Sequence, residues 1–251
     1  MRRLSEESAP LRIGTVDIPA RVERERYFSE LSYLELSVLF AGPAKPSVLA
    51  KWADETPDDA IGLVAPFPLT HRKPPVSTKL WPHDASTGEF RDSPVSRATL
   101  APLTAATAQL KASYVVFRSP ESFSPSAANR DQLKRFFGEV AVMDVPRVWV
   151  PGGLWNVRTA VKLANELGVT CAFDPLVRDP GEPPEIHYDL EADSLYLRIE
   201  GAGRTGTLRA EKLDELADLV ASYEDRELTV VFASPERWSD ARNFKKLLNE
   251  D

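Results

Sequence analysis

The chain has 251 residues, of which 43% are hydrophobic and 27% charged, so it can bury a sizeable core and is not a disordered protein. Its 31 basic and 38 acidic side chains give a formal charge of −7, which argues against a nucleic-acid partner, because nucleic-acid binders carry a basic face or domain. A single cysteine, Cys171, excludes an internal disulfide, and its apolar surroundings predict a buried, inert thiol.

The N-terminal segment is charged and lacks the apolar core of a signal peptide. We expect residues 1–10 to be flexible. The chain also contains no run of about 18 apolar residues, the length that a membrane-spanning helix needs. The expectation is therefore a soluble, cytoplasmic protein with no membrane partner.

In the first half of the chain, short apolar segments alternate with helical patterns. Strands are predicted at residues 11–15, 33–37, 61–65 and 114–118, and helices at 22–31, 46–55, 96–111 and 129–140. Pro46 suits the first turn of its helix, where its missing N–H would be unpaired anyway. Residues 66–94 are rich in Pro, Ser and charge and are interpreted as a long loop excursion, a kind of segment that is often functional or disordered.

The second half repeats the alternation. Strands are predicted at residues 147–150, 170–174, 194–200 and 228–233, and helices at 157–167, 209–223 and 236–248. Gly168 stands where a left-handed helix cap belongs. Residues 175–184 hold four prolines, so the helix after the sixth strand is expected to be irregular or missing.

Eight strands that alternate with helices over this length favour an α/β fold, a closed (β/α)8 barrel of the TIM-barrel type, in one domain over residues 1–251. A doubly wound open sheet is the main alternative, although it needs only about five to seven strands. A division into two smaller domains also fits the length.

Several segments resemble the YecE-like family, also called domain of unknown function 72 (DUF72), over nearly the whole chain. The similar segments are Arg12-Ile13-Gly14-Thr15, Tyr33-Leu34-Glu35-Leu36-Ser37, Trp52 with Thr56-Pro57, Thr70-His71, Phe117-Arg118-Ser119-Pro120 with Phe123, Tyr196-Leu197-Arg198-Ile199-Glu200-Gly201, and Val231-Phe232-Ala233-Ser234 with Ala241 and Asn243. The resemblance implies a barrel fold. It implies no activity, because the family has none established.

The chain departs from the family pattern at the strand ends. Val150-Pro151-Gly152-Gly153 replaces Glu-Phe-Arg-His after the fifth strand, although Trp155 fits the tryptophan that follows. Glu200 replaces a histidine, Ala233 and Ser234 replace paired asparagines, and Asp17-Ile18 replaces a Gly-Trp or Gly-Phe pair. These changes indicate a divergent member with a degenerate active site.

Active sites of such barrels lie where the strands end and the βα loops begin. The polar side chains predicted there are Asp17, Glu35, His71, Arg118, Asp174, Arg198, Glu200 and Ser234. We interpret Glu35, Asp174 and His71 as candidate catalytic residues, because carboxylates and a histidine can divide acid and base roles. The candidate ligand-binding residues are Asp17, Arg118, Trp155, Arg198, Glu200 and Ser234.

Some of these candidates also have a purely structural interpretation. Arg198 could pair with Glu35 or Asp174 and merely neutralise buried charge, and His71 could be an exposed bystander beside Arg72. A metal site of His71, Glu35 and Asp174 is chemically possible, but no histidine pair has metal-ligand spacing. His83 and His187 are expected at the surface. The sequence identifies neither a metal nor a cofactor.

Two glycine segments leave alternatives open. Residues 201–206 match G-x-G-x-x-G and follow the seventh strand, so they either cradle an anion with Arg204 and Ser234 or form a flexible turn. Gly152-Gly153 either allows close backbone approach to a ligand or fills space that family side chains have left. Trp81 and Phe90, in the long loop, could form a lid or a partner-binding edge, or be isolated exposed aromatics.

Three functions follow as hypotheses. The first is a barrel enzyme of hydrolase, lyase or isomerase type that uses Glu35 and Asp174 for proton transfer and Arg198 as an anion clamp. The second is a non-catalytic scaffold or binder of a small polar or anionic, sugar- or phosphate-like metabolite. The third is an interaction protein acting through residues 66–94. The sequence gives no oligomeric state.

Overall fold

The computed structural model describes residues 10–177, 194–201, 206–223 and 225–250. Its eight strands follow one another around a closed parallel barrel in sequence order, from β1 to β8. The predicted α/β barrel is therefore confirmed, and the open sheet is excluded. Among the described helices, none is long and apolar enough to cross a membrane.

The chain divides into two compact units. The first consists of residues 1–34 and 172–251, and the second of residues 35–171. The divisions fall inside two strands, β2 (Tyr33–Leu36) and β6 (Thr170–Phe173).

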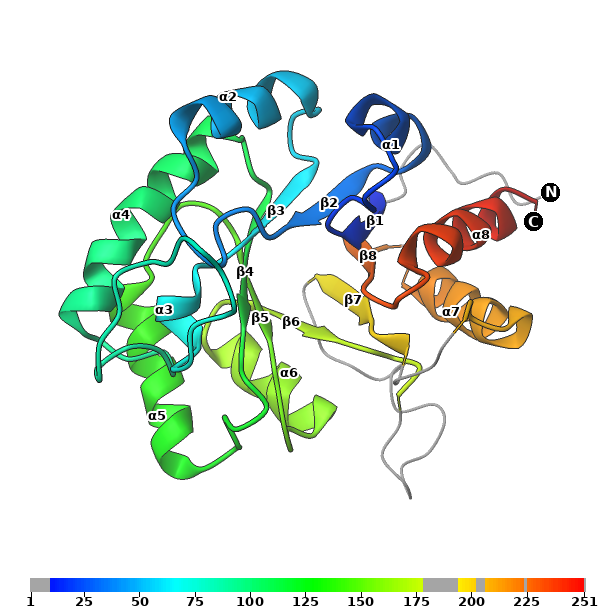
Figure 1. The fold of residues 1–251 in the computed structure, drawn as a ribbon. Helices are drawn as coiled ribbons and strands as arrows, with labels where there is room; N and C mark the ends of the chain where they lie inside the picture. Colours follow the sequence, from blue (N-terminus) through cyan, green and yellow to red (C-terminus); the bar gives the residue numbers. More distant parts are fainter. Residues whose placement is uncertain (1–9, 178–193, 202–205, 224, 251) are drawn as a thin grey trace. The chain divides into compact units, whose positions relative to one another are not determined.

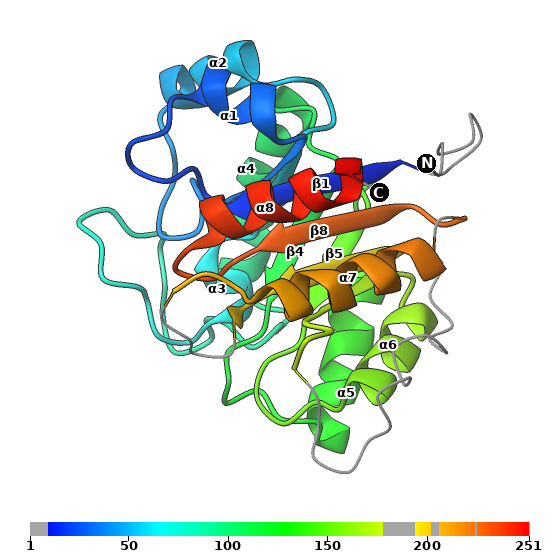
Figure 2. The ribbon, with the colours of Figure 1, turned by 90° about the vertical axis from the view of Figure 1, so that its right-hand side faces the viewer.

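The first unit contains the two ends of the chain. Its elements are β1 (Leu11–Val16), α1 (Arg24–Glu30), β7 (Leu195–Ile199), α7 (Ala210–Ser222), β8 (Leu228–Phe232) and α8 (Arg237–Glu250). Strand β8 pairs in parallel with both β1 and β7. Helices α7 and α8 pack against each other, and α8 covers β1 and β8 (Figure 2). Phe232 and Phe244, 5.7 Å apart between ring centroids, join that helix to the sheet.

The second unit contains most of the helical layer. Its elements are α2 (Pro46–Glu55), β3 (Ile61–Val64), α3 (Phe67–Thr70), α4 (Pro94–Gln109), β4 (Tyr114–Arg118), α5 (Ala127–Arg135), the π-helix η1 (Phe136–Val140), β5 (Arg147–Val150) and α6 (Val157–Glu166) (Figure 1). Strands β3, β4, β5 and β6 pair in parallel in that order.

Local chemistry explains where the helices begin and end. Ser93, Ser126 and Asn156 accept a hydrogen bond from a backbone N–H in the first turn of α4, α5 and α6. Proline begins α2 as predicted. Gly168 follows α6 with a φ of +62°, the left-handed conformation that was expected of it.

The segment 66–94 differs from the sequence interpretation. It contains the short helix α3, and the two aromatic side chains in question, Trp81 and Phe90, are buried, as is Phe67 of that helix. The indole of Trp81 donates a hydrogen bond of 2.7 Å to the Leu39 carbonyl, and Phe90 packs on the rings of Phe123 and Phe136. The idea of an exposed aromatic lid or partner-binding edge is therefore wrong. Both rings belong to the core.

Three sequence predictions lie outside the described residues. The first is the flexible start of the chain, of which only Pro10 is described. The second is the irregular connection after β6, which includes His187 and of which residues 178–193 are not described. The third is the glycine segment, whose residues 202–205 are not described.

Candidate functional site

The predicted site residues are distributed over both units. Asp17, Asp174, Arg198, Glu200 and Ser234 belong to the first unit. Glu35, His71, Arg118 and Trp155 belong to the second.

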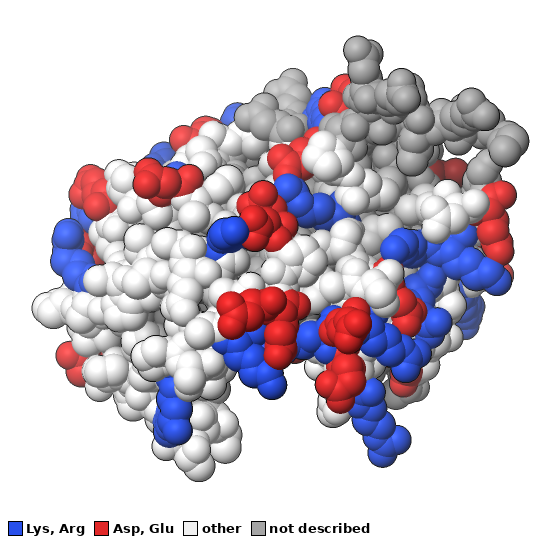
Figure 3. Space-filling model, turned by 90° about the horizontal axis from the view of Figure 1, so that it is seen from above, with Lys and Arg blue, Asp and Glu red and all other residues white. Residues whose placement is uncertain are grey.

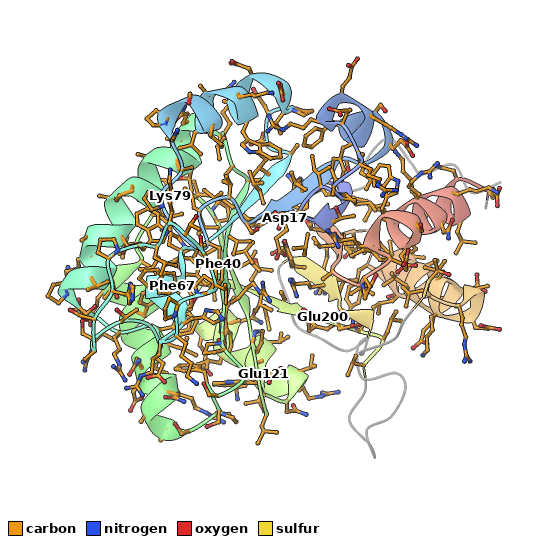
Figure 4. All side chains as sticks on the ribbon, in the orientation of Figure 1. Asp17, Phe40, Phe67, Lys79, Glu121 and Glu200 are labelled. Atoms are coloured by element: carbon orange, nitrogen blue, oxygen red, sulfur yellow. The ribbon has the colours of Figure 1, made fainter. Side chains whose placement is uncertain are left out.

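Arg198 and Glu200 form an ion pair at the carboxyl end of β7. Arg198 lies on the strand with a side chain that is 3% exposed, whereas the Glu200 side chain, just past the strand, is 52% exposed. Residues two apart on a strand point to the same face, so the two side chains meet, and Glu200 Oε1 contacts Arg198 Nη1. Figure 4 labels Glu200 at this strand end. A buried cation is thus covered by a carboxylate that reaches solvent.

Asp174, which follows β6, lies beside this pair. Its Oδ2 accepts a hydrogen bond of 2.8 Å from the Glu200 backbone N–H, and its Oδ1 accepts one of 2.9 Å from the Leu176 N–H. Burial raises the pKa of Asp174 to about 6, although backbone hydrogen bonds from Leu176 and Gly201 and the charge of Arg198 act to lower it. The carboxyl can therefore gain or lose a proton near neutral pH.

Ser234 has a structural partner that the sequence analysis missed. Its hydroxyl donates a hydrogen bond of 2.7 Å to Asp240 Oδ2, and the other oxygen of Asp240 accepts one of 2.8 Å from the Leu208 N–H. Ser234 and Asp240 are both buried. The pair ties the end of β8 to α8 and to the segment before α7.

Asp17, at the end of β1, has a φ of +49°, in the left-handed region (Figure 4). Its carbonyl accepts hydrogen bonds from Thr15 Oγ1 at 2.9 Å and from Arg237 Nε at 3.5 Å. The backbone of Asp17 thus has a role in the turn that follows β1.

Two buried tyrosines of the same unit, Tyr33 and Tyr196, were not among the predicted site residues. Tyr196 points to the same face of β7 as Arg198, and its hydroxyl lies 3.3 Å from that of Tyr33. Their rings meet edge to face with centroids 6.1 Å apart. The sequence signal that could have identified Tyr196 is its spacing of two residues from Arg198, because alternate residues of a strand point to the same face.

In the second unit, His71 follows α3 and is partly buried. Its Nδ1 lies 2.7 Å from Thr70 Oγ1, and its ring packs edge-on against Phe40 with centroids 5.3 Å apart. Burial, and then the positive charge of Arg118, lower the pKa of His71 to about 4, so the imidazole is neutral at pH 7. Glu35 is fully buried on β2, and Arg118 ends β4.

Trp155 fastens two loops together. Its indole N–H donates a hydrogen bond of 2.7 Å to the Phe123 carbonyl, its ring meets Trp149 edge-on at 4.9 Å, and Arg130 lies over it at 5.7 Å. These contacts give the indole a structural role between the β4 and β5 loops.

Gly152 and Gly153 allow a close backbone approach, but to the backbone of residues 119–121 and not to a ligand. A Cβ on Gly152 would lie 2.6 Å from the Ser119 carbonyl oxygen, and one on Gly153 would lie 2.1 Å from that of Glu121. The loop after β5 therefore passes directly over the loop after β4.

Cys171 is buried, and burial raises the pKa of its thiol, as expected for an inert cysteine. Within the described part of the chain, His, Cys, Asp and Glu side chains nowhere gather in a group of three or more that could hold a metal ion.

Comparison with known proteins supports the fold. A family model named "Protein of unknown function DUF72" matches residues 16–251. A DUF72 family protein from Enterococcus faecalis superposes with a TM-score of 0.71 at 15% identity, covering 96% of each chain. One from Thermotoga maritima gives a TM-score of 0.63 at 15% identity, covering 95% of this chain and 99% of that one.

A 3-keto-D-glucoside 4-epimerase from E. coli superposes with a TM-score of 0.55 at 12% identity, covering 96% of this chain and 100% of that one. At such identities the likeness concerns the fold alone. No curated protein matches the sequence.

Proposed function

The chain belongs to the DUF72 family of proteins of unknown function, and on that premise we propose that it binds a small anionic metabolite at the carboxyl ends of β6 and β7. The observation that carries the proposal is the buried Arg198 guanidinium covered by the solvent-reaching Glu200 carboxylate. An incoming carboxylate or phosphate group would exchange with that carboxylate and pair with the guanidinium.

The chemistry of arginine suits this exchange. A guanidinium keeps its charge at all physiological pH values and matches carboxylate and phosphate groups in geometry. A charge pair in a partly desolvated place is also stronger than one in water, because the surroundings screen it less. Glu200 can turn outward without being buried elsewhere, since half of its side chain already meets solvent.

Asp174 supports a second candidate, proton transfer to or from the bound metabolite. A catalytic acid or base works best when its pKa lies near the operating pH, and the pKa of Asp174 is raised to about 6. A metabolite found by a binding screen would be the substrate to test, and turnover that is lost in Asp174→Asn with binding retained would support this role.

Isothermal titration calorimetry tests the binding proposal. Wild-type protein is titrated with inorganic phosphate, citrate and glucose 6-phosphate, and with glucose as the uncharged comparison. We expect at least one anion to bind and glucose to bind more weakly. Arg198→Met should lower the affinity for that anion at least about tenfold, because a charge-assisted contact contributes about 1.5–3 kcal/mol.

Arg12→Met is the matched control. Arg12 pairs with Glu227 at the amino ends of β1 and β8, whereas the proposed site lies at the carboxyl ends of strands. The variant therefore removes an Arg–Glu pair of the same unit that lies away from the proposed site. It should leave anion affinity unchanged. Equal losses in both variants, or no affinity for any of the anions in the wild type, would contradict the proposal.

A further inference from the structure

A backbone feature of the second unit fixes the position of His71. Gly88, Glu89 and Phe90 are three consecutive residues in the left-handed region, with φ of +79°, +55° and +58°. Their N–H groups donate to the carbonyls of Pro68, Thr70 and Leu69 at 2.8, 2.9 and 2.9 Å. The left-handed turn thus satisfies the last carbonyls of α3, directly before His71.

The turn is held although two of its residues are not glycine. Such residues in the left-handed region cost of order 1 kcal/mol each and persist only where the surroundings determine them. Phe90 is fully buried among the rings of Phe123, Phe136 and Phe137, and Glu89 forms ion pairs with Arg72 and Arg91. Backbone strain of this kind often accompanies a functional position.

Close packing extends to His71 itself. A Cβ on Gly88 would lie 2.3 Å from the His71 carbonyl carbon, so the turn touches the histidine backbone. The His71 N–H donates a hydrogen bond of 2.7 Å to the Phe67 carbonyl. Together with the edge-on contact to Phe40, these contacts hold the ring in one orientation.

One ring nitrogen of His71 is engaged within the protein. Among the described residues, the Thr70 hydroxyl is the hydrogen-bond partner of the ring, at Nδ1. A hydroxyl that donates to Nδ1 leaves the proton of the neutral imidazole on Nε2. Nε2–H is then a fixed donor for a ligand.

Arg118 supplies positive charge to the same place. It is partly buried at the end of β4, the strand that pairs with β3 and that contacts α3, the helix directly before His71. Its positive charge acts on the His71 ring and lowers the pKa of the imidazole. A negatively charged group placed here would be stabilised by the arginine and would accept a hydrogen bond from the imidazole.

We propose that His71 and Arg118 form a second oxyanion site, in which a carboxylate or phosphate group accepts a hydrogen bond from His71 Nε2–H and pairs with the Arg118 guanidinium. Thr70 and the left-handed turn of residues 88–90 position the imidazole. The proposal rests on residues of the second unit and does not depend on anion binding at Arg198.

Nuclear magnetic resonance of the imidazole groups tests this site. The chain has 3 histidines, so the 15N-labelled protein gives three ring patterns, and His71→Gln assigns the one of interest. We expect the His71 ring to be the neutral Nε2–H tautomer at pH 7. Adding sodium phosphate, compared with sodium chloride of equal ionic strength, should move its resonances and raise its pKa by about one unit or more. Sodium acetate in a parallel titration distinguishes a carboxylate from a phosphate preference.

Variants separate this site from other sources of the response. Arg118→Met should abolish the phosphate response. If Arg118→Met does not fold, Arg118→Lys takes its place, and it should retain part of the response because it keeps the positive charge. Arg97→Met, which removes an exposed arginine paired with Asp92, should change nothing at His71. Arg198→Met should also leave the response intact, so failure of the proposed function and failure of this site give different results.

Three results would overturn the proposed site. A His71 ring in the Nδ1–H tautomer, or one whose resonances ignore both phosphate and acetate, overturns the proposal. So does a phosphate response that survives Arg118→Met.

Discussion

At Asp174, burial and hydrogen bonding act in opposite directions on one carboxyl group. Two backbone N–H groups favour the ionised form, yet burial is the larger effect and raises the pKa from 3.8 to about 6. The folded protein therefore holds a proton on Asp174 over a pH range in which the unfolded chain has released it. The contribution of Asp174 to stability follows from that difference.

We predict that this contribution is fully present below about pH 4 and is lost as the pH rises through about 6, because the pKa is higher in the folded state. The change amounts to about 2–3 kcal/mol at most. Urea unfolding of wild type and Asp174→Asn at a series of pH values measures it. The stability of the wild type relative to the variant should fall between about pH 4 and 6 and then level off. A difference that stays constant over this range would refute the prediction.

At the scale of single residues, the sequence located strand-end side chains better than it identified their partners. Alternation along β7 places Arg198 and Glu200 on one face, where they form an ion pair, whereas the sequence analysis considered Glu35 or Asp174 as the partner of Arg198. The partner of Ser234 does not follow from a local rule, because Asp240 reaches it from a helix whose orientation only the packed fold determines. The neutral state of His71 likewise depends on burial, which no local pattern reports.

At the scale of elements, the loops after β4 and β5 depend on glycine. Gly153 has a φ of +66°, and a Cβ there would meet the Glu121 carbonyl oxygen. We predict that Gly153→Ala lowers the free energy of unfolding by at least about 2 kcal/mol, because it adds both backbone strain and a clash. The urea midpoint measures the loss.

Gly138→Ala is the control for this prediction. Gly138 lies in the π-helix η1, and a Cβ there would meet nothing within 4 Å. Since alanine reduces the entropy of the unfolded chain, this variant should be neutral or more stable by about 0.5–1 kcal/mol. A similar loss of stability in both variants would show that the close approach at Gly153 is not the cause.

The elements themselves could be predicted where hydrophobic periodicity is regular. Strands β4 and β5 and helix α2 have the predicted bounds. The π-helix η1 was predicted as a continuation of α5, because the two share one hydrophobic spacing. Helix α3 was missed because Phe67–Thr70 is too short for periodicity and lies among prolines. The burial of Trp81 and Phe90 was missed because they stand in a segment rich in Pro, Ser and charge, which has no hydrophobic periodicity.

At the scale of the whole molecule, the repeat of strand and helix determines the fold and leaves the function open. Eight parallel strands close into a barrel, as the sequence predicted. Basic and acidic side chains lie next to one another on the face shown in Figure 3. Barrels of this kind carry many chemistries on the same framework, so function has to be argued from particular side chains.

The central claim is that the Glu200 carboxylate occupies the position of an anionic ligand on Arg198. Calorimetric titration of Glu200→Gln with the anion that binds the wild type most strongly tests it directly. Because the competing carboxylate is removed, we predict an affinity about threefold or more above the wild type, while the control Glu227→Gln leaves affinity unchanged. Weaker or unchanged binding by Glu200→Gln would contradict the claim.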